Sequence, residues 1–446
     1  MSSWKLWLNT NPTSLDSPVS ASNKKRIDQI GKNAWYNGSP ENIWKTEYIL
    51  IIGFAKIYNE SSLWEKIGKT KTSTNALEII VELYKIHGFE TTLEYLDGDF
   101  GFVLIDHNIF GEEALLYVAK DAFGLLPLYK SEYPDTSCKK VSFVSSENNP
   151  VSEFVENTSI AEMKASSLYI EIPSPSYSHG YYGKYIYSCC FSSEDVPMES
   201  SSTQPVPNGT YMTYRHSYKV SANWKKITED QSFYHLPFQS TYNNRNCIFS
   251  APNPNRLEEQ IRVAIQKRLE WIQWSSETKT IGLLNITIGN KKTTDFSDKI
   301  NAVIKQNTFG NIFEIGLHLF PEKEIEENES ITMLYLEEKY PTILQEIKRK
   351  IQSNDPSIIR DHVIPAMVAN HIVEKYPEIK GIIMKEAFTY EYLEMNMFER
   401  RKWIRNVSFL EKVRAWTETF LVYGLDIYMP FLDRMLIQSP DHYSRI

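Results

Sequence analysis

Cysteine is scarce in this chain, which has only Cys138, Cys189, Cys190 and Cys247 among 446 residues. These residues form no Cys-x-x-Cys pair and no other metal-binding spacing. The adjacent Cys189 and Cys190 are too close together for a relaxed disulfide. The cysteine pattern therefore excludes a disulfide framework, and we expect free thiols in a reducing, cytoplasmic compartment.

Long apolar runs and an excess of positive charge are also absent. No run approaches the ~20 residues that a membrane span needs, and the apolar run at the N-terminus is too short for a signal peptide. The net charge of −8 argues against a general nucleic-acid binder or a protein that attaches to anionic membranes. We therefore expect neither a nucleic acid nor a membrane as a partner.

Common catalytic and metal-binding motifs are missing as well. The chain has no Gly-x-Ser-x-Gly, no phosphate-binding P-loop and no Rossmann glycine pattern. Its histidines lack a chelating spacing, and His362 and His371 lie nine positions apart rather than at i and i+4. We predict no metal site.

What the chain does have is enough apolar sequence for two domains. Aromatic residues are frequent, with 27 Tyr, 21 Phe and 10 Trp, which favours large cores and broad protein interfaces. The composition shifts near residue 250, where helix signals become dominant. We therefore predict one domain over 1–250 and another over 251–446, with a mixed α/β (α+β) fold.

The first region has the pattern of a layered α/β domain. Tyr48–Phe54 is a continuous apolar run, as expected of a strand buried on both faces. Leu77–His87 has helical spacing, and Gly88 follows it as a C-cap. Phe100–Ile105 and Ala114–Ala119 are predicted to pair as a hairpin.

The second region alternates helices with strands, which indicates a parallel, doubly wound sheet. We predict helices over 256–274, 334–351, 363–375 and 399–419, and strands over 280–288, 313–319 and 379–384.

Ordered motifs in the first region resemble the glutaminase half of asparagine synthetases and other class II glutamine amidotransferases. They are Asp97–Phe100, the Asp-x-x-Gly-x-x-Pro-Leu-Tyr run Asp121–Tyr129, Phe143–Glu147 and the turn Pro207–Tyr211. The resemblance implies an Ntn-hydrolase-like αββα sandwich.

Weaker motifs in the second region resemble the synthetase half of the same enzymes. They are Arg256–Leu269, Gly282–Leu284, Phe313–Leu317 and, most specifically, Tyr423–Asp433. The resemblance implies a C-terminally truncated domain with the doubly wound ATP-pyrophosphatase fold.

The residues that carry the family's glutaminase chemistry are replaced. The resemblance implies a catalytic cysteine directly after the initiator methionine, where this chain has Ser2. The family's Asn-Gly-Glu, which supplies an oxyanion donor and a carboxylate for the substrate amine, falls on Phe54, Ala55 and Lys56. The acidic residue of its Gly-Ser-Asp substrate clamp falls on Ala76. We therefore predict no catalytic residue at this site.

The nucleotide site of the synthetase half is altered in the same way. The pyrophosphate loop falls on a segment that includes Asn285, Thr287, Gly289 and Lys291, without the paired glycines and the metal-binding aspartate. Of a second acidic motif only Glu386 is kept. We therefore expect no cofactor.

Loss at both sites predicts an asparagine synthetase-like pseudoenzyme with a structural or protein-interaction role. Its partner is expected to be a second copy, an active paralogue or a larger assembly such as a virion. One alternative is a residual or altered enzyme that uses ATP and Mg²⁺, either an ammonia-dependent amide ligase or an ATP-binding sensor, with a remodelled pocket around Thr287, Lys291 and Glu386. Another is a binding module for a small amino acid, for which Lys56 has the wrong charge to meet the amine.

Overall fold

The computed structural model describes the residues that form the sheets, most of the helices and their shorter connections. The described ranges are 5–8, 28–31, 34–37, 40–109, 113–132, 189–192, 202–217, 224–228, 230–233, 254–275, 280–288, 312–319, 330–331, 333–351, 356–384 and 407–433.

A seven-stranded antiparallel sheet forms the centre of the N-terminal unit, with the order β12-β11-β7-β6-β5-β4 and with β13 paired to β11. Its strands are β4 (Ile43–Lys45), β5 (Ile49–Ile57), β6 (Gly98–Ile109), β7 (Glu113–Lys120), β11 (Thr210–Ser217), β12 (Trp224–Lys226) and β13 (Gln231–Ser232). The predicted apolar strand and hairpin are therefore confirmed as β5, β6 and β7. In β5 every residue except Ala55 is buried, because both faces of this strand are covered.

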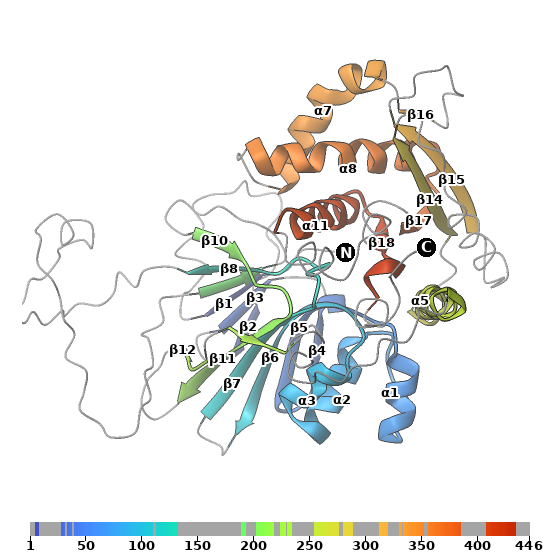
Figure 1. Cartoon of the computed structure of the whole chain (residues 1–446). Helices are drawn as coiled ribbons and strands as arrows, with labels where there is room; N and C mark the ends of the chain where they lie inside the picture. Colours follow the sequence, from blue (N-terminus) through green and yellow to red (C-terminus); the bar gives the residue numbers. More distant parts are fainter. Residues whose placement is uncertain are drawn as a thin grey trace, which may run out of the picture.

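A second antiparallel sheet of six strands has the order β10-β8-β9-β1-β3-β2. Its strands are β1 (Lys5–Leu8), β2 (Asp28–Gly31), β3 (Ala34–Asn37), β8 (Tyr129–Glu132), β9 (Cys189–Ser192) and β10 (Ser202–Pro205). Figure 1 shows this sheet on the opposite side of the seven-stranded sheet from three helices. They are α1 (Glu60–Ile67), α2 (Leu77–His87) and α3 (Phe89–Tyr95).

Apolar side chains fill both faces of the seven-stranded sheet. Alternate residues of β5 separate into two clusters, with Ile49 and Ile51 packed toward the helices and Leu50 and Ile52 packed on the other face. Helix α2 ends as predicted, because Gly88 has φ +77° and donates its N–H to the carbonyl of Tyr84. The helix, sheet and sheet layers fit an Ntn-like fold, and the outer helical layer of the αββα sandwich stays a prediction.

A third, five-stranded sheet is fully parallel and has the order β16-β15-β14-β17-β18. Its strands are β14 (Thr280–Ile288), β15 (Ile312–Leu319), β16 (Ser330–Ile331), β17 (Ile379–Met384) and β18 (Asp426–Tyr428). The first strand lies at the centre and later strands extend outward on both sides, which is the order of a doubly wound sheet. That this unit is an ATP-pyrophosphatase domain stays a prediction.

Four longer helices belong to this part of the described chain. They are α5 (Pro254–Ser275), α7 (Met333–Ile351), α8 (Pro356–Lys375) and α11 (Val407–Val422), and a 3₁₀ turn, η4 (Pro430–Leu432), follows β18. Figure 1 shows α11, α8 and α7 stacked in that order above the N-terminal sheets. No helix in the described part of the chain has the length and apolar character that a membrane crossing requires.

The two units share one hydrophobic core at their junction. Phe123 and Leu125, from the loop between β7 and β8, are buried in the cluster that contains Leu284, Ile315 and Phe420 of the C-terminal unit. The loop of the N-terminal unit therefore completes the core of the other unit.

Candidate functional site

The first two positions of the family's Asn-Gly-Glu motif are part of the core. Phe54 is 7% exposed and packs in the cluster on the face of the sheet away from the helices. Ala55 points to the other face and packs against the helix-side cluster. Neither side chain has a polar group, so neither donates a hydrogen bond to an oxyanion.

Lys56, at the third position, is buried in the contact between the units and has a relative exposure of 1%. Its Nζ donates a hydrogen bond to the carbonyl of Ile427 at 3.3 Å and lies 3.5 Å from Asp426 Oδ1. The same Nζ lies 4.5 Å from the centre of the Tyr428 ring. A carboxylate, a carbonyl and an aromatic face of β18 therefore replace the water that a buried ammonium loses.

The segment that aligns with the substrate clamp serves to start a helix. Asn75 Oδ1 accepts a hydrogen bond from the N–H of Leu77 at 2.9 Å, and its Nδ2 donates to the carbonyls of Glu41 and Ile43. Ala76 is buried beside α2. This segment fixes α2 to the edge of the sheet instead of presenting a carboxylate to a ligand.

The Asp-x-x-Gly-x-x-Pro-Leu-Tyr loop is held by the carboxylate of its first residue. Asp121 Oδ1 accepts hydrogen bonds from the N–H groups of Phe123, Gly124 and Leu125 at 2.9, 2.7 and 3.3 Å. Gly124 has φ +67°, and a Cβ at this position would lie 2.0 Å from Asn208 Oδ1. The Asp-x-x-Gly-x-x-Pro-Leu-Tyr motif thus places the side chains of Phe123 and Leu125 in the core of the C-terminal unit.

Buried charges surround this loop. The pKa of Lys120 falls to about 8, because burial disfavours its charged form. Burial raises the pKa of Asp121 to about 7, and the nearby carboxylate of Asp99 adds to the rise. Lys120 and Asp121 are adjacent in the sequence, and Lys120 directly precedes the motif.

A second buried cluster joins β8 to α11 and α8. The Tyr129 hydroxyl donates a hydrogen bond to Glu418, and His362 Nε2 lies 3.4 Å from the other oxygen of that carboxylate. Burial alone raises the pKa of Glu418, but His362 and Arg414 outweigh it and bring the pKa below its usual value. His362 is therefore a buried structural residue.

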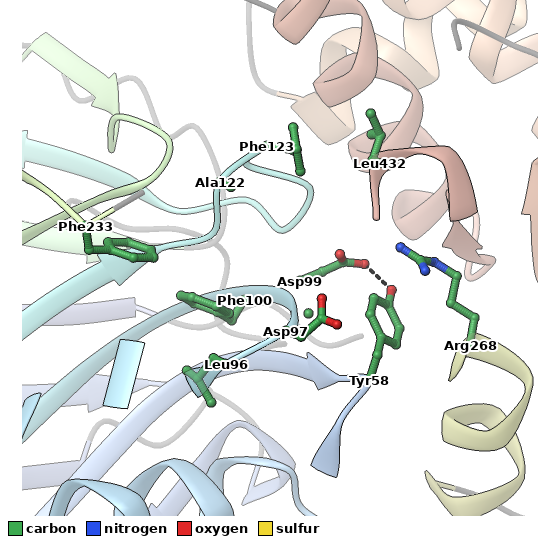
Figure 2. A pocket seen from close by; sticks show the side chains of 11 residues that line it. Tyr58, Leu96, Asp97, Asp99, Phe100, Ala122, Phe123, Phe233, Arg268 and Leu432 are labelled. Atoms are coloured by element: carbon green, nitrogen blue, oxygen red, sulfur yellow. Dashed lines mark hydrogen bonds between the residues drawn. The ribbon is translucent and has the colours of Figure 1, made fainter. Parts of the chain in front are cut away.

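A cleft lies where α5 and η4 meet the N-terminal unit (Figure 2). Arg268 Nη1 donates to Asp433 Oδ2 at 2.8 Å, and Lys267 Nζ donates to Asp97 Oδ2 at 2.6 Å. The Tyr58 hydroxyl donates a hydrogen bond to Asp99. Figure 2 shows Tyr58, Asp99 and the Arg268 guanidinium turned toward one another across the junction.

The other predicted positions are only partly placed by the structure. Asn285 and Thr287 lie in β14, near the carboxyl end of the parallel sheet. Ser2, Gly289, Lys291 and Glu386 lie outside the described residues. Within the described ranges, no group of three or more histidine, cysteine or acidic side chains is arranged to hold a metal ion.

The ionic contacts between the units were not predicted from the sequence. Two signals were available: Lys56 interrupts the apolar run of β5, and Arg268 lies next to buried Leu269 on α5. A buried cation needs a partner, but the sequence does not show that the partners are Asp426 and Asp433, more than 150 positions away.

Comparisons with known proteins support the resemblance of the N-terminal unit. Residues 39–151 match a family model described as a glutamine amidotransferase domain. The chain is 31% identical over 104 residues to the asparagine synthetase [glutamine-hydrolyzing] of Gallus gallus. It is 36% identical over 74 residues to a probable asparagine synthetase of Acanthamoeba polyphaga mimivirus, and 37% identical over 86 residues to asparagine synthetase 2 of Arabidopsis thaliana.

These matches are local. They cover 23%, 17% and 19% of this chain, and 17%, 13% and 14% of the respective relatives. Residues 39–151 are therefore similar to a glutamine amidotransferase domain, and the chain is asparagine synthetase-like over part of its length.

Proposed function

We propose that this protein is a non-catalytic member of the asparagine synthetase-like group that acts as a structural or protein-interaction subunit. The observation that carries the proposal is the position of Lys56. Where the family is expected to hold the substrate amine with a carboxylate, this chain has a buried cation bound to β18. A second ammonium at this position would meet a like charge in a site that water does not screen.

The kept motifs support the same proposal. Asp121 and Gly124 hold a loop that the core of the C-terminal unit needs, so their presence follows from stability without any catalytic role. Residues that only serve catalysis are free to change when the activity is no longer selected, because they often reduce stability.

The partner is expected to be a second copy of the chain, an active paralogue or a larger assembly such as a virion. Native mass spectrometry of the protein isolated from its source distinguishes these three. A protein found only as a free monomer would contradict the interaction role.

A second candidate function is an ammonia-dependent amide ligase that uses ATP and Mg²⁺. It is favoured by the parallel sheet, in which the strand order reverses direction between the paired strands β14 and β17, because doubly wound domains bind ligands at such a point. Isothermal titration of the full chain with ATP and Mg²⁺, and separately with glutamine, tests the two candidates. If the protein is a non-catalytic subunit, neither titration should give saturable heat, whereas saturable ATP binding favours the ligase.

A further inference from the structure

Lys56 and Asp426 join the two units through a buried contact in which the charges are only loosely paired. Lys56 lies on β5 with 1% of its side chain exposed, and Asp426 lies on β18. The lysine Nζ is 3.5 Å from Asp426 Oδ1, whereas a close hydrogen bond between such charges measures about 2.7–2.9 Å. The hydrogen bond from Nζ to the carbonyl of Ile427 is also long, at 3.3 Å. The ammonium group therefore keeps part of the cost of its burial.

An amide between these two side chains would remove both charges from the contact. An amine and a carboxyl group condense without an oxidant, a reductant or an activated donor, because the products are an amide and one water molecule. Well-oriented groups within one molecule react as if present at concentrations on the order of 10⁵–10⁸ M. The separation of 3.5 Å is at the upper end of the ~3–3.5 Å found between groups that are about to react. The fold thus supplies the proximity that this condensation needs.

Aromatic rings surround the contact. The centre of the Tyr428 ring lies 4.5 Å from Lys56 Nζ, and Trp271 packs on Tyr428 with the ring centres 6.2 Å apart. Tyr58 packs edge-on against the same Trp271 ring at 6.4 Å. Exclusion of bulk water protects an amide from hydrolysis once it has formed. Asp426 is 17% exposed, which gives the product water a route to solvent.

Asp99 is the group placed to carry protons in such a reaction. It lies opposite Lys56 in the register of β5 and β6 and is 6% exposed. Its Oδ2 accepts a hydrogen bond from the Tyr58 hydroxyl, which orients the carboxyl group. Burial raises the pKa of Asp99, although Arg268 and Lys56 oppose the rise. A carboxyl group with a raised pKa takes up and returns a proton nearer to neutral pH than an ordinary aspartate does.

We propose that Lys56 and Asp426 form an intramolecular isopeptide bond that joins β5 covalently to β18. Lys56 passes one proton to Asp99, and the freed lone pair of Nζ attacks Cγ of Asp426. The Nζ–Cγ bond forms and one Cγ–O bond breaks. The departing oxygen takes the proton from Asp99 and a second proton from the nitrogen, and it leaves as water. The ion pair is the reactant of this step, and in either form the contact ties the two units together.

Intact mass spectrometry of the purified full chain tests the proposal directly. We expect a mass that is lower than the sequence mass by one water molecule. Trypsin should then release segment 46–66, uncut at Lys56, joined to segment 415–434. Lys267 and Asp97 form a closer ion pair, at 2.6 Å, but Lys267 is 19% exposed. This more hydrated pair is the internal control, and its two tryptic peptides should stay separate.

Substitutions identify the reacting groups. Lys56→Arg keeps a cation but has no nucleophilic amine, so this variant should have its full sequence mass. Asp426→Asn keeps the reacting carbon with another leaving group, so its joined chain should have lost ammonia instead of water. Asp99→Asn should lower the fraction of joined chain at least tenfold when samples are taken at equal times after cell-free synthesis. Asp97→Asn, which changes the neighbouring carboxylate, should leave that fraction unchanged.

The decisive result is obtained with the wild-type chain, so it does not depend on the folding of any variant. A wild-type chain of full sequence mass, with segments 46–66 and 415–434 found only apart, would overturn the proposal. Water loss that persists in Lys56→Arg would overturn it as well. An unchanged joined fraction in Asp99→Asn would contradict the role of Asp99 as the proton carrier.

Discussion

Lys56→Glu restores the residue type that the resemblance implies at this position, and we expect it to destabilise the protein instead of restoring a substrate site. The new carboxylate would be buried within reach of Asp426 and beside Asp99, its partner in the register of β5 and β6. Breaking a buried ion pair typically costs about 3–5 kcal/mol. Because Asp426 is 17% exposed and keeps some solvation, we expect the lower half of that range, about 3 kcal/mol.

Lys56→Met separates charge from volume in the same contact. Methionine keeps the packing but loses the hydrogen bond to Ile427 and the interaction with the Tyr428 ring, while the cost of burying a charge disappears. We expect a loss of about 1–2 kcal/mol. Urea unfolding followed by tryptophan fluorescence measures both variants. A cost under 0.5 kcal/mol for Lys56→Glu would refute the contact between β5 and β18.

Three further predictions concern the loop between β7 and β8. Gly124→Ala should cost about 1 kcal/mol more than Gly424→Ala in urea unfolding. Both glycines have positive φ, but only a Cβ at position 124 meets another side chain, that of Asn208, which would have to move and give up its hydrogen bond to the carbonyl of Phe123. Phe123→Ala should cost about 3 kcal/mol, because this ring belongs to the core of the C-terminal unit. The whole chain should still unfold in one cooperative transition. Two separate unfolding transitions would contradict the shared core. Asp121→Asn should remove a pH dependence. The pKa of Asp121 rises from 3.8 to about 7 on folding. The wild type therefore loses stability as the pH rises from 4 to 7. Over this range its free energy of unfolding should fall, relative to that of the variant, by about 1 kcal/mol per pH unit.

Much of the fold follows from local sequence patterns. The apolar run of β5, the helical spacing of α2 and the Gly88 cap depend on neighbouring residues, and the structure confirms each of them. The parallel sheet follows from the alternation of helices and strands after residue 250.

The contacts between the units did not follow from the sequence, because they join positions far apart. Lys56 has the same identity whether it faces a ligand or β18, and only the packing of β18 against β5 decides which. The same holds for Phe123, whose apolar character predicts burial but not the unit in which it is buried.

Release of labelled ammonia from amide-¹⁵N-glutamine tests the central proposal most directly. The purified full chain is incubated with labelled glutamine, with and without aspartate, ATP and Mg²⁺, beside an active asparagine synthetase as the positive control. We expect ammonia release no faster than in buffer alone under every condition. Release that follows turnover kinetics and is lost in Ser2→Ala would contradict it.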